Sequence, residues 1–330
     1  MNSIIMKIAF FEIKDWEAEI VKKTFKEHKL SFFTESLNSS NASKAKDAEI
    51  ISVFIYSKID TETLKQLPKL KMITTRSTGF DHINVDECKK KGIIVCNVPF
   101  YGENTVAEHT FALILALSRN VHKSYMRSIK NDYSTDGLIG FDLYGKTLGV
   151  VGAGHIGMHV IRIAKGFGMK VIAFDVIQNK FLSEVLGFEY KPLNDVLKEA
   201  DIITMHAPYN KHTHHMMNKE SFKLMKKDAL FINTSRGAIV DTEALLEALN
   251  KKLISGAGLD VLEGESIMKE ETPAIGKKIG ESIDQKIVAL DNVVFTPHIA
   301  FYSKEALQRI LDTTMQNIVD FLDNKTKNCV

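Results

Sequence analysis

Short runs of β-branched and other apolar residues alternate along the chain with longer stretches in which apolar residues recur every three or four positions. The short runs predict buried strands, and the longer stretches predict amphipathic helices. Strands that alternate with helices are typical of parallel βαβ units. The pattern therefore predicts an α/β protein built on parallel sheets.

The predicted strands form two series, separated near Pro99 and Gly102, where the periodicity breaks. The strands are predicted at 7–11, 50–55, 72–75 and 93–96, and then at 147–151, 170–175, 202–205, 229–233, 255–259 and 293–296. The main helices are predicted at 16–28, 61–67, 85–91, 105–120, 158–167 and 304–321.

The last of these helices is amphipathic and would return the chain to the first series. We therefore expect a discontinuous domain of residues 1–100 and 300–330 and a second domain of residues 101–299. Two chain crossings at adjacent points would form a hinge, with a cleft between the domains.

The composition indicates a globular protein without an affinity for nucleic acid or membranes. Lys and Arg number 43 against 41 Asp and Glu, and the net charge of +2 gives no electrostatic reason to expect nucleic acid as a partner. The longest apolar run, 111–117, is far shorter than the roughly 20 residues that span a bilayer. Cys88, Cys96 and Cys329 form neither a CxxC pair nor an even set, which predicts a reducing, cytoplasmic location and no zinc site.

A glycine fingerprint follows the predicted strand at 147–151. Gly152 would permit a tight turn, Gly154 would let a pyrophosphate approach the backbone, and Gly157 would let the next helix pack close to the strand. Asp175 ends the following strand, where its carboxylate could accept hydrogen bonds from ribose hydroxyls. We therefore expect a Rossmann-like dinucleotide-binding domain after a flavodoxin-like first domain.

The same acid indicates which dinucleotide is bound. The carboxylate of Asp175 would repel a 2′-phosphate, and no arginine occurs at 176–180 to accept one. NAD is therefore expected in preference to NADP.

Three further motifs follow the fingerprint in order: INTSRGAIVD at 232–241, GLDVLEGE at 258–265 and TPHIA at 296–300. Together with NVPFY at 97–101 and VAEH at 106–109, they resemble the D-isomer-specific 2-hydroxyacid dehydrogenases over essentially the whole chain. The long interval between Glu265 and Pro297, and the aromatic pair Phe301-Tyr302, are similar to the D-lactate and D-2-hydroxyisocaproate branch of that family.

The resemblance implies that Arg236, Glu265 and His298 form the catalytic set. Reduction of a 2-oxo acid needs a hydride from nicotinamide and a proton for the developing alkoxide, and an imidazole suits the proton transfer near neutral pH. Glu265 would favour the protonated ring and fix its orientation. Arg236 would grip the substrate carboxylate and polarise the adjacent carbonyl.

The resemblance also assigns the residues that would bind coenzyme and substrate. The coenzyme-binding residues would be Gly152, Gly154, His155, Ile156, Gly157, Asp175, His206, Pro208, Thr213, Thr234, Asp260 and Val106. The substrate-binding residues would be Thr78, Gly79, Tyr101, Tyr56 and Phe301. Backbone N–H groups of Thr78 and Gly79 would cradle the substrate carboxylate, and the three aromatic residues would leave room for a short side chain, which favours pyruvate.

Several histidines lie close together in the sequence, at His206, His212, His214 and His215. No carboxylate or cysteine lies at a helical i, i+4 offset from them, so no metal site is expected.

The predicted activity is the NADH-dependent reduction of pyruvate to D-lactate by a homodimer that associates through the helix at 105–120. Two alternatives remain. One is a broader D-2-hydroxyacid dehydrogenase or a glyoxylate/hydroxypyruvate reductase, and the other is an NAD-sensing binding protein like the corepressors that share this fold. The complete Arg, Glu and His set favours an enzyme, although a fold alone does not decide function.

Overall fold

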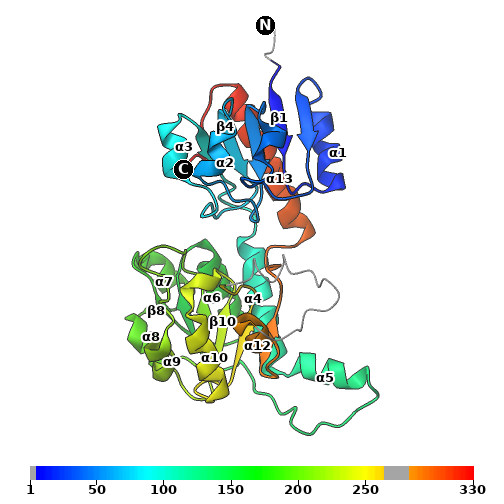
Figure 1. Cartoon of the computed structure of the whole chain (residues 1–330). Coiled ribbons are helices and arrows are strands. Elements are labelled where there is room, and N and C mark those ends of the chain that lie inside the picture. The colour runs from blue at the N-terminus through cyan, green and yellow to red at the C-terminus, as the bar shows by residue number, and fades with distance from the viewer. Residues whose placement is uncertain (1–4, 264–281) are drawn as a thin grey trace. The chain divides into compact units, whose positions relative to one another are not determined.

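The computed structural model describes residues 5–263 and 282–330, and it divides the chain into two compact units (Figure 1). The first unit comprises residues 1–101 and 303–330, and the second comprises residues 102–302. Each unit is built on a parallel sheet with helices packed against it. The predicted fold class of two parallel-sheet α/β domains is confirmed.

The first unit contains five parallel strands in the order β2-β1-β3-β4-β5, which is the flavodoxin-like order. Alternate residues of β1 face opposite sides of the sheet: Ile8 and Phe10 pack with helices α1 and α13, whereas Ala9 packs in the core on the other side. The strands are β1 Lys7–Phe10, β2 Lys29–Phe32, β3 Ile50–Val53, β4 Met72–Thr75 and β5 Ile94–Cys96. The helices are α1 Asp15–Thr24, α2 Thr61–Lys65, α3 Val85–Lys90 and α13 Lys304–Leu322, with a 3₁₀ turn at Ala42–Ala45.

Short polar side chains set the starting points of three helices in this unit. Asp60 accepts a hydrogen bond from the N–H of Thr63 before α2, and Asn84 accepts one from Glu87 before α3. Ser303 does the same for Ala306 at the start of α13. Each cap satisfies an N–H group that has no partner within its helix.

The second unit contains seven parallel strands in the order β12-β11-β10-β9-β6-β7-β8. Counted from β6, this is the dinucleotide-binding order 3-2-1-4-5-6 with one strand added at the edge. The strands are β6 Thr147–Val151, β7 Lys170–Phe174, β8 Glu189–Tyr190, β9 Ile202–Met205, β10 Leu230–Asn233, β11 Gly256–Leu259 and β12 Val293–Phe295. The helices are α4 Glu103–Ser118, α5 Val121–Ser128, α6 His155–Gly166, α7 Lys180–Leu186, α8 Leu193–Glu199, α9 Lys219–Leu224, α10 Thr242–Asn250 and α12 Ile283–Val288, with a 3₁₀ turn at Gly237–Ile239.

Two apolar cores cover the two faces of this sheet. On one face α4 and α6 bury Phe111, Ile114 and Val160 against strand residues that include Leu148. On the other face α8, α9, α10 and α12 pack around Phe222 and its neighbours. Every strand from β9 to β11 is buried along its whole length, as expected for a parallel sheet covered on both sides.

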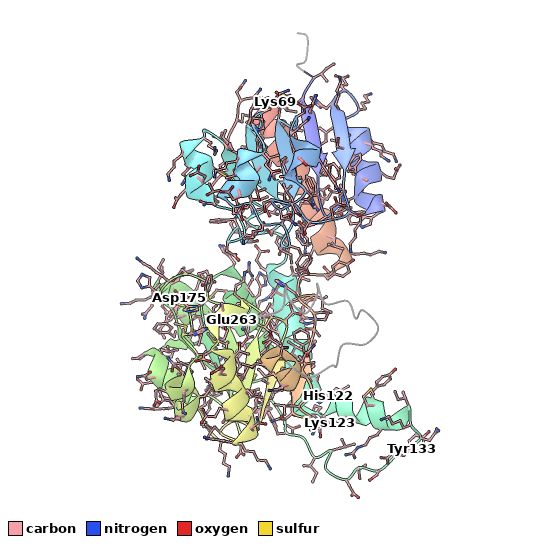
Figure 2. The ribbon with its side chains drawn as sticks, in the orientation of Figure 1. Lys69, His122, Lys123, Tyr133, Asp175 and Glu263 are labelled. Carbon is pink, nitrogen blue, oxygen red and sulfur yellow. The ribbon has the colours of Figure 1, made fainter. Side chains whose placement is uncertain are left out.

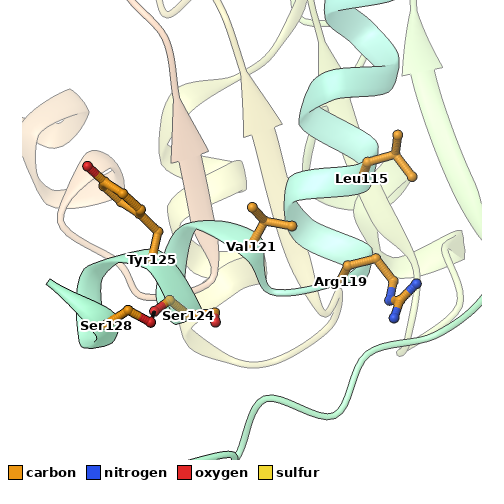
Figure 3. Close-up of a pocket in the computed structure, with 6 residues that line it drawn as sticks. All are labelled: Leu115, Arg119, Val121, Ser124, Tyr125 and Ser128. Carbon is orange, nitrogen blue, oxygen red and sulfur yellow. Dashed lines mark hydrogen bonds between the residues drawn. The ribbon is translucent and has the colours of Figure 1, made fainter. Parts of the chain in front are cut away.

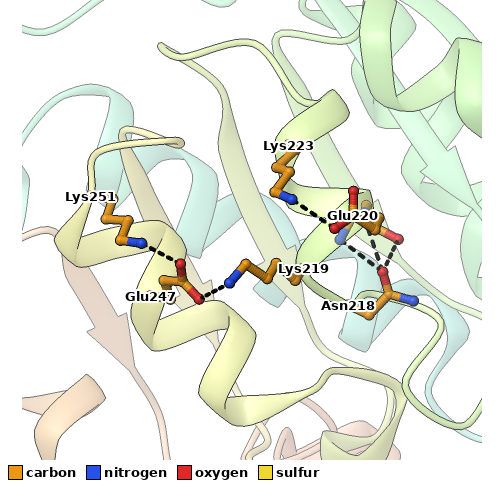
Figure 4. Close-up of polar contacts among 7 residues, drawn as sticks. Asn218, Lys219, Glu220, Lys223, Glu247 and Lys251 are labelled. Carbon is orange, nitrogen blue, oxygen red and sulfur yellow. Dashed lines mark hydrogen bonds and ion pairs between the residues drawn. The ribbon is translucent and has the colours of Figure 1, made fainter.

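Ion pairs join α9 to α10 on the surface of this second core (Figure 4). Glu247 accepts a hydrogen bond from Lys251, the C-cap residue of α10, and pairs with Lys219 of α9 at 3.0 Å. Lys251 and Lys219 together lower the pKa of Glu247 to about 2. Because both lysines are exposed to solvent and Glu247 is only partly buried, the pairs contribute little to the free energy of unfolding.

Several elements differ from those predicted. The predicted helix at 16–28 ends at Thr24, and the chain then forms the edge strand β2, Lys29–Phe32. Only two residues of β2, Leu30 and Phe32, face the core, which is too short an alternation to recognise in the sequence. The short strand β8 and the helices α5, α7, α8, α9, α10 and α12 were also not predicted. Helix α5 has no buried residue, and its apolar side chains, among them Val121 and Tyr125, are exposed.

Candidate active site

The glycine loop connects β6 to α6 in the second unit. Gly152 has a φ of +96°, in the left-handed region that favours glycine, and a Cβ there would lie 2.6 Å from the backbone of His206 and Ala207. A Cβ on Gly157 would collide with the carbonyl oxygen of Gly152. Gly157 therefore lets the first turn of α6 pack against the loop, which brings the N-terminus of the helix to the carboxyl end of β6.

Helix α6 begins at His155 and Ile156, directly after Gly154. A Cβ on Gly154 would meet no atom within 4 Å, so open space lies in front of the first N–H groups of a twelve-residue helix. N–H groups at the start of a helix bind phosphate well because they have no partner within the helix and carry the positive end of its dipole. The loop therefore fits the pyrophosphate of a dinucleotide.

Asp175 follows β7 at the carboxyl edge of the second unit's sheet (Figure 2). Its carboxylate is hydrogen bonded to the glycine loop. Its Oδ2 accepts from the N–H of Ala153 at 2.7 Å, and its Oδ1 accepts from Ile177 at 2.9 Å. A carboxylate has about four acceptor positions, so lone pairs remain for the hydroxyls of a ribose. Asp175 thus fixes the loop and keeps acceptor capacity at the edge of the sheet.

His206 follows β9, next to β6 at the point where the strand order reverses. Its N–H donates to the carbonyl of Val151 at 2.7 Å, and its Nε2 lies 2.9 Å from the hydroxyl of Thr204. Burial lowers the pKa of His206 to about 3, so the ring is neutral near physiological pH. In the described part of the chain its buried Nδ1 has no hydrogen-bond partner.

The segment after His206 forms a compact turn. The hydroxyl of Thr213 donates to the carbonyl of Pro208 at 2.7 Å and accepts from the N–H of Asn210 at 2.8 Å. Pro208 and Thr213 therefore lie together beside the end of β9, at the strand-order reversal where α/β sheets bind their ligands.

Arg236 lies just beyond β10, in a half-buried position before the 3₁₀ turn. Its Nη1 donates to the carbonyl of Ser235 at 2.8 Å, and the amide of Asn233 donates to the carbonyl of Arg236 at 3.0 Å. Thr234, on the same loop, lies 3.0 Å from the hydroxyl of Thr110, which in turn donates to the carbonyl of Val106 on α4. Thr110 therefore links Thr234 and Val106, two residues that were expected to bind the coenzyme.

Asp260 follows β11 and is fully buried. Its carboxylate accepts hydrogen bonds from the hydroxyl of Thr296 at 2.5 Å and from the N–H groups of Ile299 and Ala300, both at 2.9 Å. The N–H of His298 donates to the carbonyl of Asp260 at 2.8 Å. Asp260 therefore holds the loop that carries His298.

His298 itself has a φ of +55°, a strained conformation for a residue with a side chain, which the four hydrogen bonds to Asp260 maintain. The ring of Phe301 lies edge-on to the imidazole, with centroids 6.3 Å apart. His109 of α4 also reaches this loop: its Nε2 is 2.9 Å from the hydroxyl of Thr296 and 3.5 Å from Oδ1 of Asp260. Burial lowers the pKa of His109, and the Asp260 carboxylate opposes that shift.

The remaining expected residues lie at the carboxyl ends of strands in the first unit. After β4, Thr78 donates through its hydroxyl to the carbonyl of Val98, and its own carbonyl accepts from the amide of Asn97, both at 2.8 Å. The hydroxyl of Ser77 donates to the carbonyl of Gly79 at 2.6 Å. Tyr56 follows β3 with 46% of its surface exposed, and the carbonyl of Tyr101 accepts from Nε of Arg309 at 2.6 Å.

A buried arginine that was not predicted supports these loops. The guanidinium of Arg76 donates to the carbonyls of Phe11 and Glu12 at 2.8 Å and to the hydroxyl of Ser52 at 2.9 Å. The carboxylate of Glu12 then accepts from the N–H groups of Phe54 and Tyr56, both at 2.9 Å. A charged residue directly after an apolar strand was the only sign of this network in the sequence.

Within the second unit, the glycine loop, Asp175, His206, Arg236, Asp260 and His298 all follow strands of one parallel sheet, at its carboxyl edge. Glu265, the third expected catalytic residue, lies outside the described residues. Its neighbour Glu263 is described and lies at the same edge as Asp175 (Figure 2).

Glu263 contacts the histidines for which no metal site was expected. Nε2 of His215 lies 3.0 and 3.1 Å from the two carboxylate oxygens of Glu263, and His214 supplies a third atom within 4.8 Å that could ligate a metal. The rings of His214 and His215 are stacked, with centroids 3.9 Å apart and planes inclined by 22°. A metal in the plane of one ring would lie outside the plane of the other, so His214 would have to rotate before both could bind the same ion.

Comparison with known proteins identifies the family. The family model described as "D-isomer specific 2-hydroxyacid dehydrogenase, NAD binding domain" matches residues 111–300. The D-lactate dehydrogenase of Escherichia coli is 35% identical over 325 residues, which cover 97% of this chain and 98% of that protein. The chain belongs to the D-isomer-specific 2-hydroxyacid dehydrogenases.

Other members of the family are similar over the same length. A glyoxylate reductase of Pyrococcus furiosus is 35% identical over 327 residues, which cover 97% of this chain and 89% of that enzyme. The D-lactate dehydrogenase of Aquifex aeolicus, solved in a complex with NAD and lactic acid, has a TM-score of 0.89 and 40% identity, and the match covers 96% of each chain.

This D-2-hydroxyacid dehydrogenase is therefore an oxidoreductase that uses NAD, as predicted from the fingerprint. When bound, the coenzyme supplies or accepts the hydride. None of the helices in the described ranges, 5–263 and 282–330, is long and apolar enough to cross a membrane.

Proposed function

We propose that this dehydrogenase reduces pyruvate to D-lactate with NADH and that His298 supplies the proton. The observation that carries the proposal is the position of Arg236 and His298 after β10 and β12, at one edge of the sheet that carries the glycine loop. The D-lactate dehydrogenases among its relatives support the choice of substrate.

In this proposal Arg236 binds the carboxylate of the 2-oxo acid and draws electron density from its carbonyl group. Hydride from the nicotinamide goes to the carbonyl carbon, and the proton of the His298 imidazolium goes to the carbonyl oxygen. Asp260 keeps the His298 loop in place and is therefore a positioning residue. Glu265 would orient the imidazole ring, and the N–H groups of Thr78 and Gly79 would hold the substrate carboxylate.

The side chains Tyr56, Tyr101 and Phe301 are proposed to limit the size of the group at C3 of the substrate. An additional methylene in such a pocket changes the binding free energy by about 1–3 kcal/mol, so longer 2-oxo acids would react more slowly but measurably. We further propose that Asp175 favours NADH over NADPH, because its carboxylate repels a 2′-phosphate.

The main alternative is a glyoxylate or hydroxypyruvate reductase, and a relative named glyoxylate reductase favours it. A corepressor-like protein that binds NAD without catalysis is the other alternative predicted from the sequence. The cytoplasmic location predicted from the cysteines also stays a prediction.

Steady-state oxidation of NADH should distinguish these functions. We expect the highest kcat/KM with pyruvate, with 2-oxoisocaproate and phenylpyruvate lower by about tenfold or more. Chiral chromatography should identify the product of pyruvate as D-lactate, and NADPH should support slower turnover than NADH. A higher kcat/KM with glyoxylate or hydroxypyruvate would contradict the proposed substrate, and an L product would contradict the proposed geometry.

We also propose that the enzyme is a homodimer. The interface proposed here combines the end of the predicted helix at 105–120 with helix α5 and the loop that follows it. Helix α5 and the loop that follows extend away from the rest of the second unit (Figure 1). With the end of α4 it forms a shallow groove, whose apolar lining is Leu115, Val121 and Tyr125 and whose polar lining is Arg119, Ser124 and Ser128 (Figure 3). Further exposed apolar residues continue along the segment at Met126, Ile129, Tyr133, Ile139 and Tyr144. An apolar surface of this kind favours burial against a second copy of the same chain.

Substitution of Tyr125 by Asp should weaken the dimer, because it places a charge in the centre of the proposed interface. We expect the dissociation constant of the dimer, measured by sedimentation equilibrium, to rise by at least about 30-fold. Phe181→Asp is the matched control, since Phe181 is similarly exposed on α7, outside this surface. A monomeric wild-type chain, or equal effects of the two substitutions, would rule out this interface.

A further inference from the structure

Two of the three cysteines lie side by side in the first unit, although 233 positions separate them in the sequence. Cys96 is the last residue of β5, and Cys329 is the penultimate residue of the chain. Their Sγ atoms are 2.7 Å apart, and both are free thiols. The third cysteine, Cys88, is buried in the core on the opposite face of the same sheet from Cys96.

The backbone aligns the two cysteines as an antiparallel pair. The N–H of Asn97 donates to the carbonyl of Asn328, and the N–H of Val330 donates to the carbonyl of Val95, both at 3.0 Å. These bonds flank Cys96 and Cys329, which are therefore a non-hydrogen-bonded pair, the type whose Cα atoms are about 4.5 Å apart. That separation is within the range of disulfides, so the bond needs no rearrangement of the backbone.

We propose that Cys96 and Cys329 are a thiol modification site, at which a reversible disulfide fastens the C-terminus to the edge of the first unit's sheet. The proposal does not depend on the substrate or on the catalytic residues proposed above. Its oxidant is a low-molecular-weight disulfide, RSSR. The overall reaction converts two cysteine thiols and RSSR into one protein disulfide and two molecules of RSH.

The exposure of the two thiols sets the order of the steps. The exposed Cys329 thiolate attacks RSSR, which breaks its S–S bond, releases one RS⁻ and leaves a mixed disulfide on Cys329. The Cys96 thiolate then attacks Sγ of Cys329, and the second RS⁻ leaves; both leaving groups take up the protons lost by the cysteines. Burial raises the pKa of the Cys96 thiol, and the adjacent Cys329 raises it further, so the second step is faster at alkaline pH.

The disulfide would also restrain residues that the substrate proposal uses. Asn97, next to Cys96, donates through its amide to the carbonyl of Thr78. Asn317 of α13 donates to the carbonyl of Asn97 at 2.8 Å and accepts from the amide of Asn328 at 2.9 Å. Fraying of the C-terminus would release this network, and a covalent bond between residues 96 and 329 would prevent the release.

The test treats the enzyme with oxidised glutathione at pH 8 and stops thiol exchange with acid. Because Cys88 and Cys96 are buried, the protein is then unfolded in guanidinium chloride before the remaining thiols are blocked with N-ethylmaleimide and counted by mass spectrometry. We expect the number of alkylated thiols to fall from three to one, Cys88, and a tryptic peptide pair linked through Cys96 and Cys329. Dithiothreitol should reverse both changes. The melting temperature of the oxidised enzyme should exceed that of the reduced enzyme by roughly 5 °C or more, because the bond closes a very long loop.

Three variants make the result specific. Cys88→Ser should still form the bond, whereas Cys96→Ser and Cys329→Ser should not, and neither should gain thermal stability on oxidation. Hydrogen exchange at the amides of 95–98 should slow only in the variants that form the bond. Three alkylated thiols after oxidation, or a glutathione adduct that persists on Cys329 of the wild type, would overturn the proposal.

Discussion

Replacement of His298 by Asn should lower kcat by roughly 10²–10⁴-fold, the usual contribution of a general acid. Asn is the informative substitution because residue 298 has a φ of +55°, and Asn adopts this conformation more readily than other residues with a side chain. The hydrogen bonds that hold the loop use the backbone of residues 298–300 and the Asp260 carboxylate, so they do not need the imidazole. The variant should therefore fold and bind NADH normally.

Two measurements separate loss of proton transfer from loss of binding. The Kd for NADH, from fluorescence titration, should change less than about threefold, while the rate of a single turnover with pyruvate should fall as kcat does. His212→Asn is the control, because His212 is exposed on a loop of the same unit and has no proposed role. A His298→Asn enzyme that keeps a tenth or more of the wild-type kcat would exclude His298 as the proton donor.

The glycine loop could be predicted from the sequence because all its determinants are local. A strand, a turn, a helix and the next strand occur within about thirty residues, and each glycine stands where a larger residue would clash or strain the backbone within that segment. The structure shows two of these requirements: Gly152 has a positive φ, and a Cβ on Gly157 would collide with Gly152. The buried strands of both sheets could also be predicted, because continuous β-branched runs are typical of parallel sheets.

Polar contacts between distant residues left no such pattern. Glu263 binds His215 from 48 positions away, and Cys96 lies beside Cys329 across 233 positions. Periodicity reports only which face of an element is apolar, and it carries no information on which two polar side chains will meet. The three cysteines therefore gave no sign that Cys96 and Cys329 would lie together, and the sequence around the histidines gave no sign that Glu263 would lie beside His215.

Asp260 shows a different limit of motif-based assignment. The resemblance implies a coenzyme-binding role, but the carboxylate is fully buried and bonded to the His298 loop. A motif shows that a residue type recurs at a position in the family, but it does not show whether that residue contacts the ligand. Here the contacts favour an indirect role, in which the negative charge is stabilised by two backbone N–H groups and one hydroxyl.

Substitution of Gly154 by Ala should weaken NADH binding by about tenfold or more while the protein remains folded. The φ of −76° is allowed for alanine, and the added Cβ would meet no protein atom within 4 Å. It would instead occupy the open space before the first N–H groups of α6, where a pyrophosphate would have to approach the backbone. Alanine is a poorer N-cap than glycine, so we expect a loss of at most about 1 kcal/mol in the free energy of unfolding.

Gly157→Ala, in contrast, should lower the free energy of unfolding more than Gly154→Ala does. Its Cβ would collide with the carbonyl oxygen of Gly152, a backbone atom that cannot rotate away, so α6 must shift from the sheet. Forced overpacking of this kind costs about 1–3 kcal/mol, which should appear as a lower midpoint in urea. Gly166→Ala is the control, since it lies at the end of the same helix with open space around it. If Gly154→Ala instead lowers the urea midpoint as far as Gly157→Ala and leaves the NADH Kd unchanged, then the space before α6 does not receive the pyrophosphate.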